Sequence, residues 1–539
     1  MPVSVRAQPS GGLARPALRP TPPPALGVFV RQHLGVSALL SDTALRFPDR
    51  TAVVEGDSRI TYRDLWADVL RYAAALRERG VRPGNRVAVM LPNVAAFPRV
   101  YHAVIAAGAT VVPVHGLLVA EEVEFVLRHS GSVLTISGGA LWPTARAAAD
   151  AAGIPMLAAD HEHPGAPLTA AHPTTADDIA AILYTSGTTG RPKGARLTHL
   201  NIVLNATVCA QDLHELGPGD VVLGCLPLFH SYGQTCAMNA ALRAGATLVL
   251  MPRFDAAAAL ELMAAEGVSV FMGVPTMFHA LTEAARASGA TAPTLRLAVS
   301  GGAALPVAGL ERFEAAFETR VFEGYGLTET SPAATFNQRL LGRRPGTVGH
   351  AIRGVEVAIA AAEVDERIEL LPAGAVGEVV VRGHNVFAGY LDDPAATAAA
   401  IVDGWFRTGD LGAVDDEGFL SIVDRKKDLV IRGGYNVYPR EVEEVLARHP
   451  AIAQVAVYGA AHEALGEEIH AAVVLRPAAP GTEPPTPDDL IAWSREHLGR
   501  HKYPRVFHPM SALPLGPTGK ILKRALRDAT PPPSGAAAR

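Results

Sequence analysis

The sequence has little cysteine, few aromatic residues and no strong excess of charge of either sign. Its 539 residues include three cysteines and 6% aromatic residues, and its formal net charge is −5. This near-neutral balance argues against nucleic acid as the main partner, because polyanion binding needs a strong basic footprint. The cysteines, Cys209, Cys225 and Cys236, are too few and too close together for a secreted disulfide framework. We therefore predict a cytoplasmic protein with reduced cysteines.

Signals for secretion or membrane insertion are also missing. No apolar run follows the first arginines, so a signal peptide is not predicted. Residues 100–120 carry no Asp, Glu, Lys or Arg, but Gly108 and Pro113 interrupt them. A buried helix followed by a strand explains this stretch better than a membrane span. We expect no transmembrane segment.

Proline and small residues dominate both ends of the chain. Residues 1–27 and 529–539 each contain a run of three prolines and almost no periodic apolar pattern. Such segments cannot bury enough apolar surface to order themselves. We predict two disordered tails and assign them no function.

Between the tails, short apolar runs alternate with amphipathic helical patterns, which is typical of an α/β fold. Residues 51–62 predict a hairpin, followed by a helix with Thr61 as its N-cap and Gly80 as its stop. Three further apolar runs have the length of strands: 86–91, 246–251 and 295–301.

The pattern of apolar and charged residues in the sequence changes near residue 424. After it we expect a helix over 439–449, strands over 452–460 and 470–477, and a helix near 487–498. About 100 residues of this kind make a small α+β domain. We therefore predict a large domain over 28–424 and a small domain over 425–528.

The most informative segment is AILYTSGTTGRPKGARLTH, at residues 181–199. An apolar strand ends at Tyr184 and opens into a loop rich in Gly, Ser and Thr. Backbone N–H groups and hydroxyls in such a loop, together with a lysine, can cradle phosphates. The loop is not a Walker A motif, because the chain has no GxxxxGK[ST]. The candidate phosphate-binding residues are Thr185, Ser186, Gly187, Thr188, Thr189, Gly190 and Lys193.

At this segment the chain resembles the adenylate-forming superfamily, which includes acyl-CoA synthetases, aryl-CoA ligases, carrier-loading adenylation domains and firefly luciferase. Six further motifs of that superfamily follow in order, so the resemblance spans about residues 28–528. They are PLFHSYG (227–233), SGGAALP (300–306), GYGLTETSP (324–332), GWFRTGDLG (404–412), DRKKDLVIRGGYNVYPREVE (424–443) and PLGPTGKILK (514–523). The resemblance implies a large multi-subdomain N-terminal adenylate-forming domain and a small mobile C-terminal domain.

The resemblance also implies a two-step reaction with ATP, Mg²⁺ and coenzyme A. A carboxylate attacks the α-phosphate of ATP, pyrophosphate leaves, and a thiol then displaces AMP. Charge develops on the phosphates, so fixed cations and N–H donors should dominate catalysis. The implied catalytic residues are Lys520, which reaches the α-phosphate, Thr328, which bonds the same phosphate, Glu329, which holds Mg²⁺, and His230, which lies over the acyl carboxylate.

Other residues are implied to bind the nucleotide. Tyr325 would stack on adenine, Asp410 would accept the ribose hydroxyls, and Arg425 would contact the ribose or the phosphate. Two of these roles have a simpler structural alternative. Tyr325 also fits an aromatic residue of the core, and Asp410 also fits a turn. The remaining members of the implied nucleotide site are Gly302, Gly324 and Gly326.

The resemblance assigns Lys427 to a hinge about which the small domain rotates. Gly433 and Gly434 would then move beside the channel that admits the thiol. Two adjacent glycines equally suit a tight turn. No cysteine lies in a nucleophile motif, so we expect the thioester to form on the acceptor.

The candidate acyl pocket is small or apolar in character, which suits a hydrophobic tail. Gly324 stands where malonate-type members carry a basic residue, so a short dicarboxylate is disfavoured. PLFHSYGQT looks most like bacterial fatty-acid–CoA ligases of medium or long chain, whereas Tyr232 also occurs in hydroxycinnamate-type ligases. The pocket candidates are Tyr232, Gly233, Val274, Gly301, Pro332 and Ala333.

We therefore predict a fatty-acid–CoA ligase of the AMP-forming type. Two alternatives share its motifs: an acyl-AMP ligase that loads an acyl carrier protein, and an aryl acid–CoA ligase. A non-enzymatic scaffold is disfavoured, because Lys193, Glu329 and Lys520 are all present.

Overall fold

The computed structural model describes residues 34–162, 164–185, 192–288, 295–477, 483–516 and 519–530. The chain divides into two units, Met1–His33 and Leu34–Arg539, and only the second contains described residues. The expected N-terminal tail and loop residues 186–190 lie outside these ranges. At the other end only the first two residues of the expected tail are described, and one of them closes the last helix, α14 (Lys523–Ala529).

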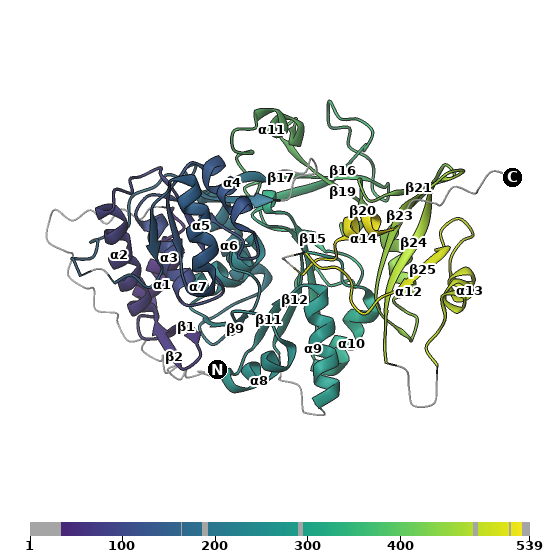
Figure 1. The fold of residues 1–539 in the computed structure, drawn as a ribbon, viewed down its shortest axis with the longest axis horizontal. Coiled ribbons are helices and arrows are strands. Elements are labelled where there is room, and N and C mark those ends of the chain that lie inside the picture. Colours follow the sequence, from purple (N-terminus) through teal and green to yellow (C-terminus); the bar gives the residue numbers. More distant parts are fainter. Residues whose placement is uncertain are drawn as a thin grey trace, which may run out of the picture. The chain divides into compact units, whose positions relative to one another are not determined.

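Two largely parallel sheets form the framework of the large domain (Figure 1). The nine-stranded sheet has the order β15-β14-β13-β12-β11-β9-β10-β1-β2 and is parallel except at its edges, where β13–β14, β14–β15 and β1–β2 pair antiparallel. Its strands are β1 (Thr51–Glu55), β2 (Ser58–Thr61), β9 (Val221–Gly224), β10 (Thr247–Leu250), β11 (Val270–Gly273), β12 (Leu297–Ser300), β13 (Val321–Gly326), β14 (Ala333–Phe336) and β15 (His350–Ala351).

The six-stranded sheet has the order β6-β5-β3-β4-β7-β8 and is parallel except for the β7–β8 pair. Its strands are β3 (Arg86–Met90), β4 (Thr110–Pro113), β5 (Ser132–Ser137), β6 (Met156–Ala158), β7 (Ile179–Thr185) and β8 (Lys193–Thr198).

Alternate residues of these strands enter different cores, because successive side chains point to opposite faces of a sheet. In β3, Val87 and Val89 join the central core, whereas Ala88 and Met90 join the core on the opposite face. Burial on both faces explains why these strands are almost continuously apolar.

Helices cover both sheets. The central core contains side chains from α1 (Ala38–Arg46), α2 (Tyr62–Glu78), α3 (Ala96–Ala106), α6 (His199–Val208), η2 (Cys209–Leu213), η3 (Tyr232–Asn239) and α7 (Ala240–Ala244). The far face of the six-stranded sheet packs on α4 (Ala120–Ser130) and α5 (Trp142–Ala152), which follows η1 (Gly139–Leu141). The far face of the nine-stranded sheet packs on α8 (Ala256–Glu266), α9 (Pro275–Ser288) and α10 (Val307–Phe317).

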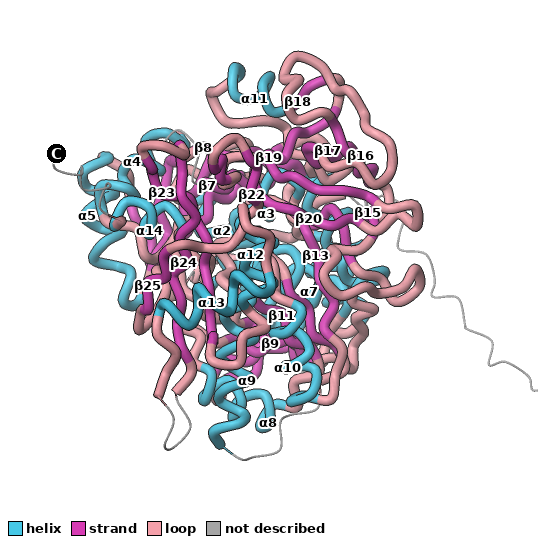
Figure 2. The backbone as a smooth tube through the Cα atoms, turned by 90° about the vertical axis from the view of Figure 1, so that its right-hand side faces the viewer, coloured by secondary structure: helices cyan, strands magenta, loops and turns pink. Residues whose placement is uncertain are grey.

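Two smaller sheets follow along the chain. The first pairs its strands antiparallel and comprises β16 (Val355–Ala360), β17 (Gly377–Gly383), β18 (Ile401–Val402), β19 (Trp405–Val414) and β20 (Leu420–Arg425), with α11 (Pro394–Ala400) beside β18. The second comprises β21 (Val430–Arg432), β22 (Tyr435–Val437), β23 (Ile452–His462), β24 (Gly466–Leu475) and β25 (Val506–Pro509) (Figure 2). One face of this sheet packs on α12 (Pro439–Leu446) and α13 (Pro487–His497). The other face packs on α14.

Several local predictions are confirmed. Thr61 caps α2, and its side chain accepts a hydrogen bond from the Asp64 N–H. The expected hairpin is formed by β1 and β2. Residues 100–120 divide into the end of α3 and β4, and no helix in the described ranges is long and apolar enough to cross a membrane. The third sheet ends at Arg425 and the fourth begins at Val430, and the domain boundary at residues 424–425 stays a prediction.

Candidate active site

The motif residues meet where parallel strands end. β7, β9, β12 and β13 each run into a loop that carries motif residues: Thr185, His230, Gly301 and Tyr325 all lie at or just beyond a strand end. Ligands of open α/β sheets bind outside the carboxyl ends of the strands, because the loops there diverge. Here these loops surround a cavity of about 1120 Å³.

One part of the cavity is lined by Tyr325, Thr408 and Arg425. The Tyr325 hydroxyl donates a 2.8 Å hydrogen bond to Asp410 Oδ2, and Arg425 Nε lies 3.0 Å from Asp410 Oδ1. Asp410 raises the pKa of the Arg425 guanidinium, so this cation stays charged. Asp410 is buried behind Thr408 and Gly409 and does not itself line the cavity. Each carboxylate oxygen has two lone-pair sites, so these bonds leave acceptor capacity at Asp410, but its side chain does not face the cavity in this arrangement.

A buried carboxylate occupies the middle of the cavity. Glu329, on the short helix η4 (Thr328–Thr330), accepts a 3.0 Å hydrogen bond from the Tyr390 hydroxyl and a 3.4 Å bond from Thr185 Oγ1. None of the described residues forms an ion pair with it within 4 Å. Lys193 Nζ lies 5.1 Å from the centre of the Tyr390 ring and 3.7 Å from an Asp393 carboxylate oxygen.

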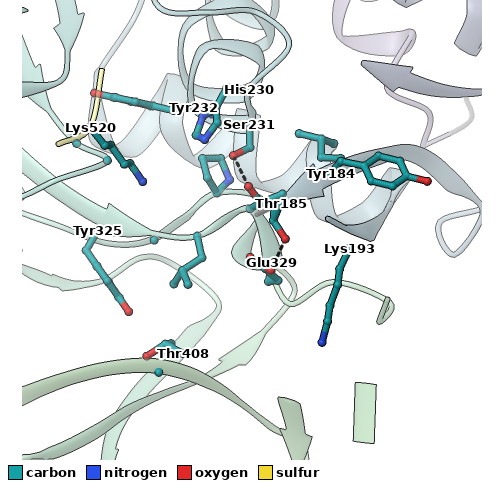
Figure 3. Close-up of a pocket in the computed structure, with 18 of the residues that line it drawn as sticks. Tyr184, Thr185, Lys193, His230, Ser231, Tyr232, Tyr325, Glu329, Thr408 and Lys520 are labelled. Carbon is teal, nitrogen blue, oxygen red and sulfur yellow. Dashed lines mark hydrogen bonds between the residues drawn. The ribbon is translucent and has the colours of Figure 1, made fainter. Parts of the chain in front are cut away.

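Two hydroxyls stand beside this carboxylate. Thr328 Oγ1 and Ser231 Oγ are 3.4 Å apart, and both side chains are buried (Figure 3). Both residues line the cavity. Hydroxyls in a buried site can donate to phosphate oxygens, so the pair is suited to a negatively charged group.

Lys520 reaches the cavity from the C-terminal region. The loop that carries it is held by Thr276 Oγ1, which donates a 3.2 Å hydrogen bond to Gly519 O. Gly302 has a φ of 81°, and a Cβ added there would lie 3.5 Å from Lys520 Cε, so glycine suits both the backbone and the space. Burial, with Arg425 nearby, lowers the pKa of Lys520 to about 8. The lysine therefore remains mostly charged at neutral pH.

His230 faces the same space (Figure 3). Its Nδ1 accepts a 3.3 Å hydrogen bond from the Tyr232 N–H, which fixes the ring. Burial, with Lys520 and His115 nearby, lowers the pKa of His230 to about 3. The imidazole is therefore neutral across the physiological range and can hydrogen-bond to a carboxylate without a charge of its own.

From here the cavity continues into an apolar branch. Tyr232 forms one wall, and its hydroxyl donates a 3.0 Å hydrogen bond to Val299 O. A Cβ on Gly301 would lie 3.1 Å from the Tyr232 ring, so glycine allows the close contact. Pro332 and Ala333 also line the cavity. Further residues that line this branch are Cys209, Leu213, His214, Cys236, Val299 and Phe336.

Some expected residues do not line the cavity. A Cβ on Gly233 would lie 2.3 Å from Pro227 O, so Gly233 faces the backbone of the preceding loop. Val274 is buried behind Gly302 and Gly519. Gly433 and Gly434 form the turn between β21 and β22, with φ values of 56° and 84°, and they lie away from the cavity in this arrangement.

Lys427 lines the cavity, as do Gly324 and Gly326, whereas Ser186, Gly187, Thr188, Thr189 and Gly190 lie outside the described residues.

The motifs did not point to several residues of the site. Tyr390 positions Glu329 but belongs to no motif that we recognised, and its only signal is its place in GYL before two aspartates. Phe336 lies more than 100 residues after Cys209 and His214 in sequence, and no motif connects it to them. Only the fold brings such residues together.

Known proteins share this architecture. Residues 40–391 match the AMP-binding enzyme family, and residues 441–520 match the AMP-binding enzyme C-terminal domain. A long-chain-fatty-acid–CoA ligase of Bacillus subtilis is 34% identical over 531 residues, covering 91% of this chain and 94% of that protein. A feruloyl-CoA synthase of an Amycolatopsis species is 37% identical over 490 residues, covering 89% and 96%.

A solved structure has the same fold. The crystal structure of ATP-bound MatB from Rhodopseudomonas palustris matches with a TM-score of 0.82 at 32% identity, and the match covers 92% of this chain and 99% of that one. The two family matches, the shared fold and the assembled cavity lead to one conclusion. The chain belongs to the AMP-binding, adenylate-forming enzymes and is an acyl- or aryl-CoA ligase.

Proposed function

We propose that this enzyme activates a fatty acid as its acyl-adenylate and transfers the acyl group to coenzyme A, with AMP and pyrophosphate as the other products. The observation that carries the proposal is the continuity of one cavity, which joins Tyr325 and Arg425 at one end to the apolar branch beyond Tyr232. Lys520 and His230 lie between these ends. A carboxylate bound between them would meet the α-phosphate of ATP.

In the first half-reaction, a carboxylate oxygen forms a bond to the α-phosphorus while the bond to the pyrophosphate oxygen breaks. Negative charge spreads over the α-phosphate oxygens during this step. Charged Lys520 and the hydroxyl of Thr328 would stabilise that charge, and neutral His230 would orient the acid. Thr185 and Lys193 stand on the side where the β- and γ-phosphates would extend.

Glu329 is suited to Mg²⁺. It is a buried carboxylate that receives hydroxyl hydrogen bonds and has no cation partner among the described residues. In the described ranges no group of three or more His, Cys, Asp or Glu side chains could hold a metal ion. Mg²⁺ is commonly bound by one or two carboxylates together with substrate phosphates, so a single glutamate is sufficient. When bound, the ion would neutralise phosphate charge.

In the second half-reaction, the sulfur of the thiol forms a bond to the acyl carbon and AMP leaves. We propose that the region after Lys427 rotates for this step, so that Lys520 withdraws and the Gly433–Gly434 turn approaches the thiol channel. Lys427 lies between β20 and β21, where one sheet ends and the next begins. A rotation there would move a whole sheet without breaking a strand pair.

The apolar lining of the branch supports a medium- or long-chain fatty acid. Leu213, Cys236, Val299 and Phe336 all line the cavity there. An aryl acid is the second candidate, because Tyr232 presents an aromatic wall and the feruloyl-CoA synthase covers nearly the whole chain. Coenzyme A is favoured over a carrier protein by the relatives named as CoA ligases. A cytosolic reaction fits three cysteines that are all free thiols.

The proposal is tested by pyrophosphate release with a panel of fatty and aryl acids, measured with and without coenzyme A. Release that rises strongly with coenzyme A and peaks at one fatty-acid length supports the proposal. Acid-dependent release that coenzyme A does not accelerate indicates a carrier protein as acceptor. Higher kcat/KM for an aryl acid than for every fatty acid would replace the fatty-acid assignment.

A further inference from the structure

The far end of the apolar branch contains a histidine. His214 follows η2 and is only 2% exposed, and its ring lines the cavity beside Cys209 and Leu213. The ring packs edge-on against Phe336, with centroids 5.5 Å apart and an interplanar angle of 67°. A histidine is unexpected there, because an apolar tail needs no polar partner.

The fold holds His214 in place from behind. Its N–H donates a 2.9 Å hydrogen bond to Cys209 O, and its carbonyl accepts a 3.1 Å bond from Arg296 Nη2. Arg296 is in turn paired with both carboxylate oxygens of Asp220, at 2.9 and 3.0 Å. These bonds use the backbone of His214 and leave its ring unpaired.

Neither ring nitrogen of His214 has a hydrogen-bond partner among the described residues. Nδ1 is enclosed by protein atoms, which leaves Nε2 as the nitrogen available to a molecule in the cavity. A buried polar group without a partner costs free energy, so such groups usually meet a ligand or an ordered water. The neighbouring Thr335 hydroxyl differs, since it donates a 2.8 Å bond to Val348 O.

The position of His214 identifies the part of the acid that it would meet. Arg296 directly precedes β12, whereas Gly301 and Gly302 directly follow it at the reaction centre. Through the bond from Arg296, the backbone of His214 is therefore tied to the end of β12 that is opposite the reaction centre. Any group that reaches it belongs to the distal end of a bound acid.

We propose that the acid carries an uncharged oxygen, a hydroxyl or a carbonyl, at or near its distal end, and that His214 binds this oxygen through Nε2. The proposal rests on the proposed function and adds a feature of its substrate. A distal carboxylate fits less well, because burial and the nearby Arg296 lower the pKa of His214 to about 3 and keep the imidazole neutral. A neutral imidazole either donates to an oxygen or accepts from a hydroxyl.

The test compares matched acids with the full-length enzyme. The kcat/KM for coenzyme A-dependent AMP formation is measured for straight-chain acids of six to twelve carbons and for their terminal hydroxy and penultimate keto counterparts. Cinnamate and 4-hydroxycinnamate form a further pair. We expect one oxygenated acid to exceed its unsubstituted partner by about 10- to 100-fold, because a site with an unpaired polar group rejects the analogue that lacks the matching group.

Three variants locate the effect. His214→Leu should bring the ratio of oxygenated to plain acid close to one, and His214→Gln should retain part of it because an amide still hydrogen-bonds. Leu213→Ala is the matched control, since it changes the shape of the same wall without changing its hydrogen bonds, and it should keep the preference for oxygenated acids.

Two results would overturn the inference. The first is a wild-type ratio of kcat/KM, oxygenated to plain acid, of one or less for every pair, as expected if only a water pairs with His214. The second is a preference for the oxygenated acid that persists in His214→Leu. Either result with coenzyme A-dependent turnover intact leaves the proposed function standing. Absence of turnover with every acid would contradict the proposed function itself.

Discussion

The two ends of the cavity are built in different ways. At the nucleotide end, Tyr325, Asp410 and Arg425 form a chain of charged and polar contacts at 2.8 and 3.0 Å, and each comes from a contiguous motif. At the acyl end, Cys236, His214 and Phe336 come from separate elements and touch mainly through apolar surface. Under the proposed function, the chemistry shared by the family lies at one end and the choice of acid at the other.

The largest expected effect comes from Lys520→Ala at the reaction centre. Adenylate formation should fall by at least about 10²–10³-fold with every acid, because a fixed charge beside the transition state is lost. Thioester formation from supplied acyl-adenylate should be spared, since the lysine is proposed to leave the site for that step. The two half-reactions are followed separately by pyrophosphate release and by acyl-CoA formation.

Lys502→Ala is the matched control for this variant. Lys502 belongs to the same C-terminal region but pairs with Glu441, at 2.6 Å, and does not line the cavity. The Lys502→Ala variant should leave the rates of both half-reactions close to those of the wild type. Equal loss of both half-reactions in Lys520→Ala would contradict the proposed rotation of the C-terminal region.

A smaller effect is expected for Tyr390→Phe, which removes the 3.0 Å hydrogen bond to Glu329. The Mg²⁺ concentration for half-maximal adenylation should rise about 10- to 100-fold, because partners that orient a metal ligand contribute on this scale. Tyr72→Phe removes a comparable hydrogen bond, to Ala158 O at 2.8 Å, far from the cavity, and should not change the Mg²⁺ requirement. An unchanged Mg²⁺ requirement in Tyr390→Phe would contradict the proposal that Glu329 binds the metal.

The pH dependence of adenylation should report the protonation state of Lys520. Its pKa is lowered to about 8, and it is the protonated lysine, present below this pH, that stabilises the phosphate charge. The kcat/KM of adenylation should therefore fall as pH rises above about 8, by roughly tenfold per unit, since kcat/KM reports the free enzyme. Lys520→Arg should move this limb to higher pH, because arginine keeps its proton. A profile that stays flat to pH 10 would show that the charge of Lys520 is not required.

The smallest effect is expected at the acyl end. Cys236→Ala removes one sulfur atom from the wall of the apolar branch. The ratio of kcat/KM between two acids of different bulk should change by about three- to tenfold, because pocket contacts of this size discriminate weakly. The KM for ATP should stay the same. A parallel change in the KM for ATP would show that the two ends of the cavity are not independent.

Prediction from the sequence succeeded where the signal was local. The N-cap at Thr61, the hairpin of β1 and β2 and the alternation of strands and helices depend on neighbouring residues, and all are present. The placement of Gly233 and Val274 in the acyl pocket differed from the structure. Both are close in sequence to residues that line the cavity, but their orientation depends on the packing of Pro227 and Gly519.

The sequence by itself determined the family and identified motif residues that meet at the strand ends. These residues stand on short contiguous segments that follow strands, so each segment can be identified as a motif. Only the tertiary structure decided that Tyr390 hydrogen-bonds to Glu329, that Tyr325 hydrogen-bonds to Asp410, and that His214 and Phe336 line the same cavity. These contacts join residues far apart in sequence, and no local pattern records which surfaces a fold brings together.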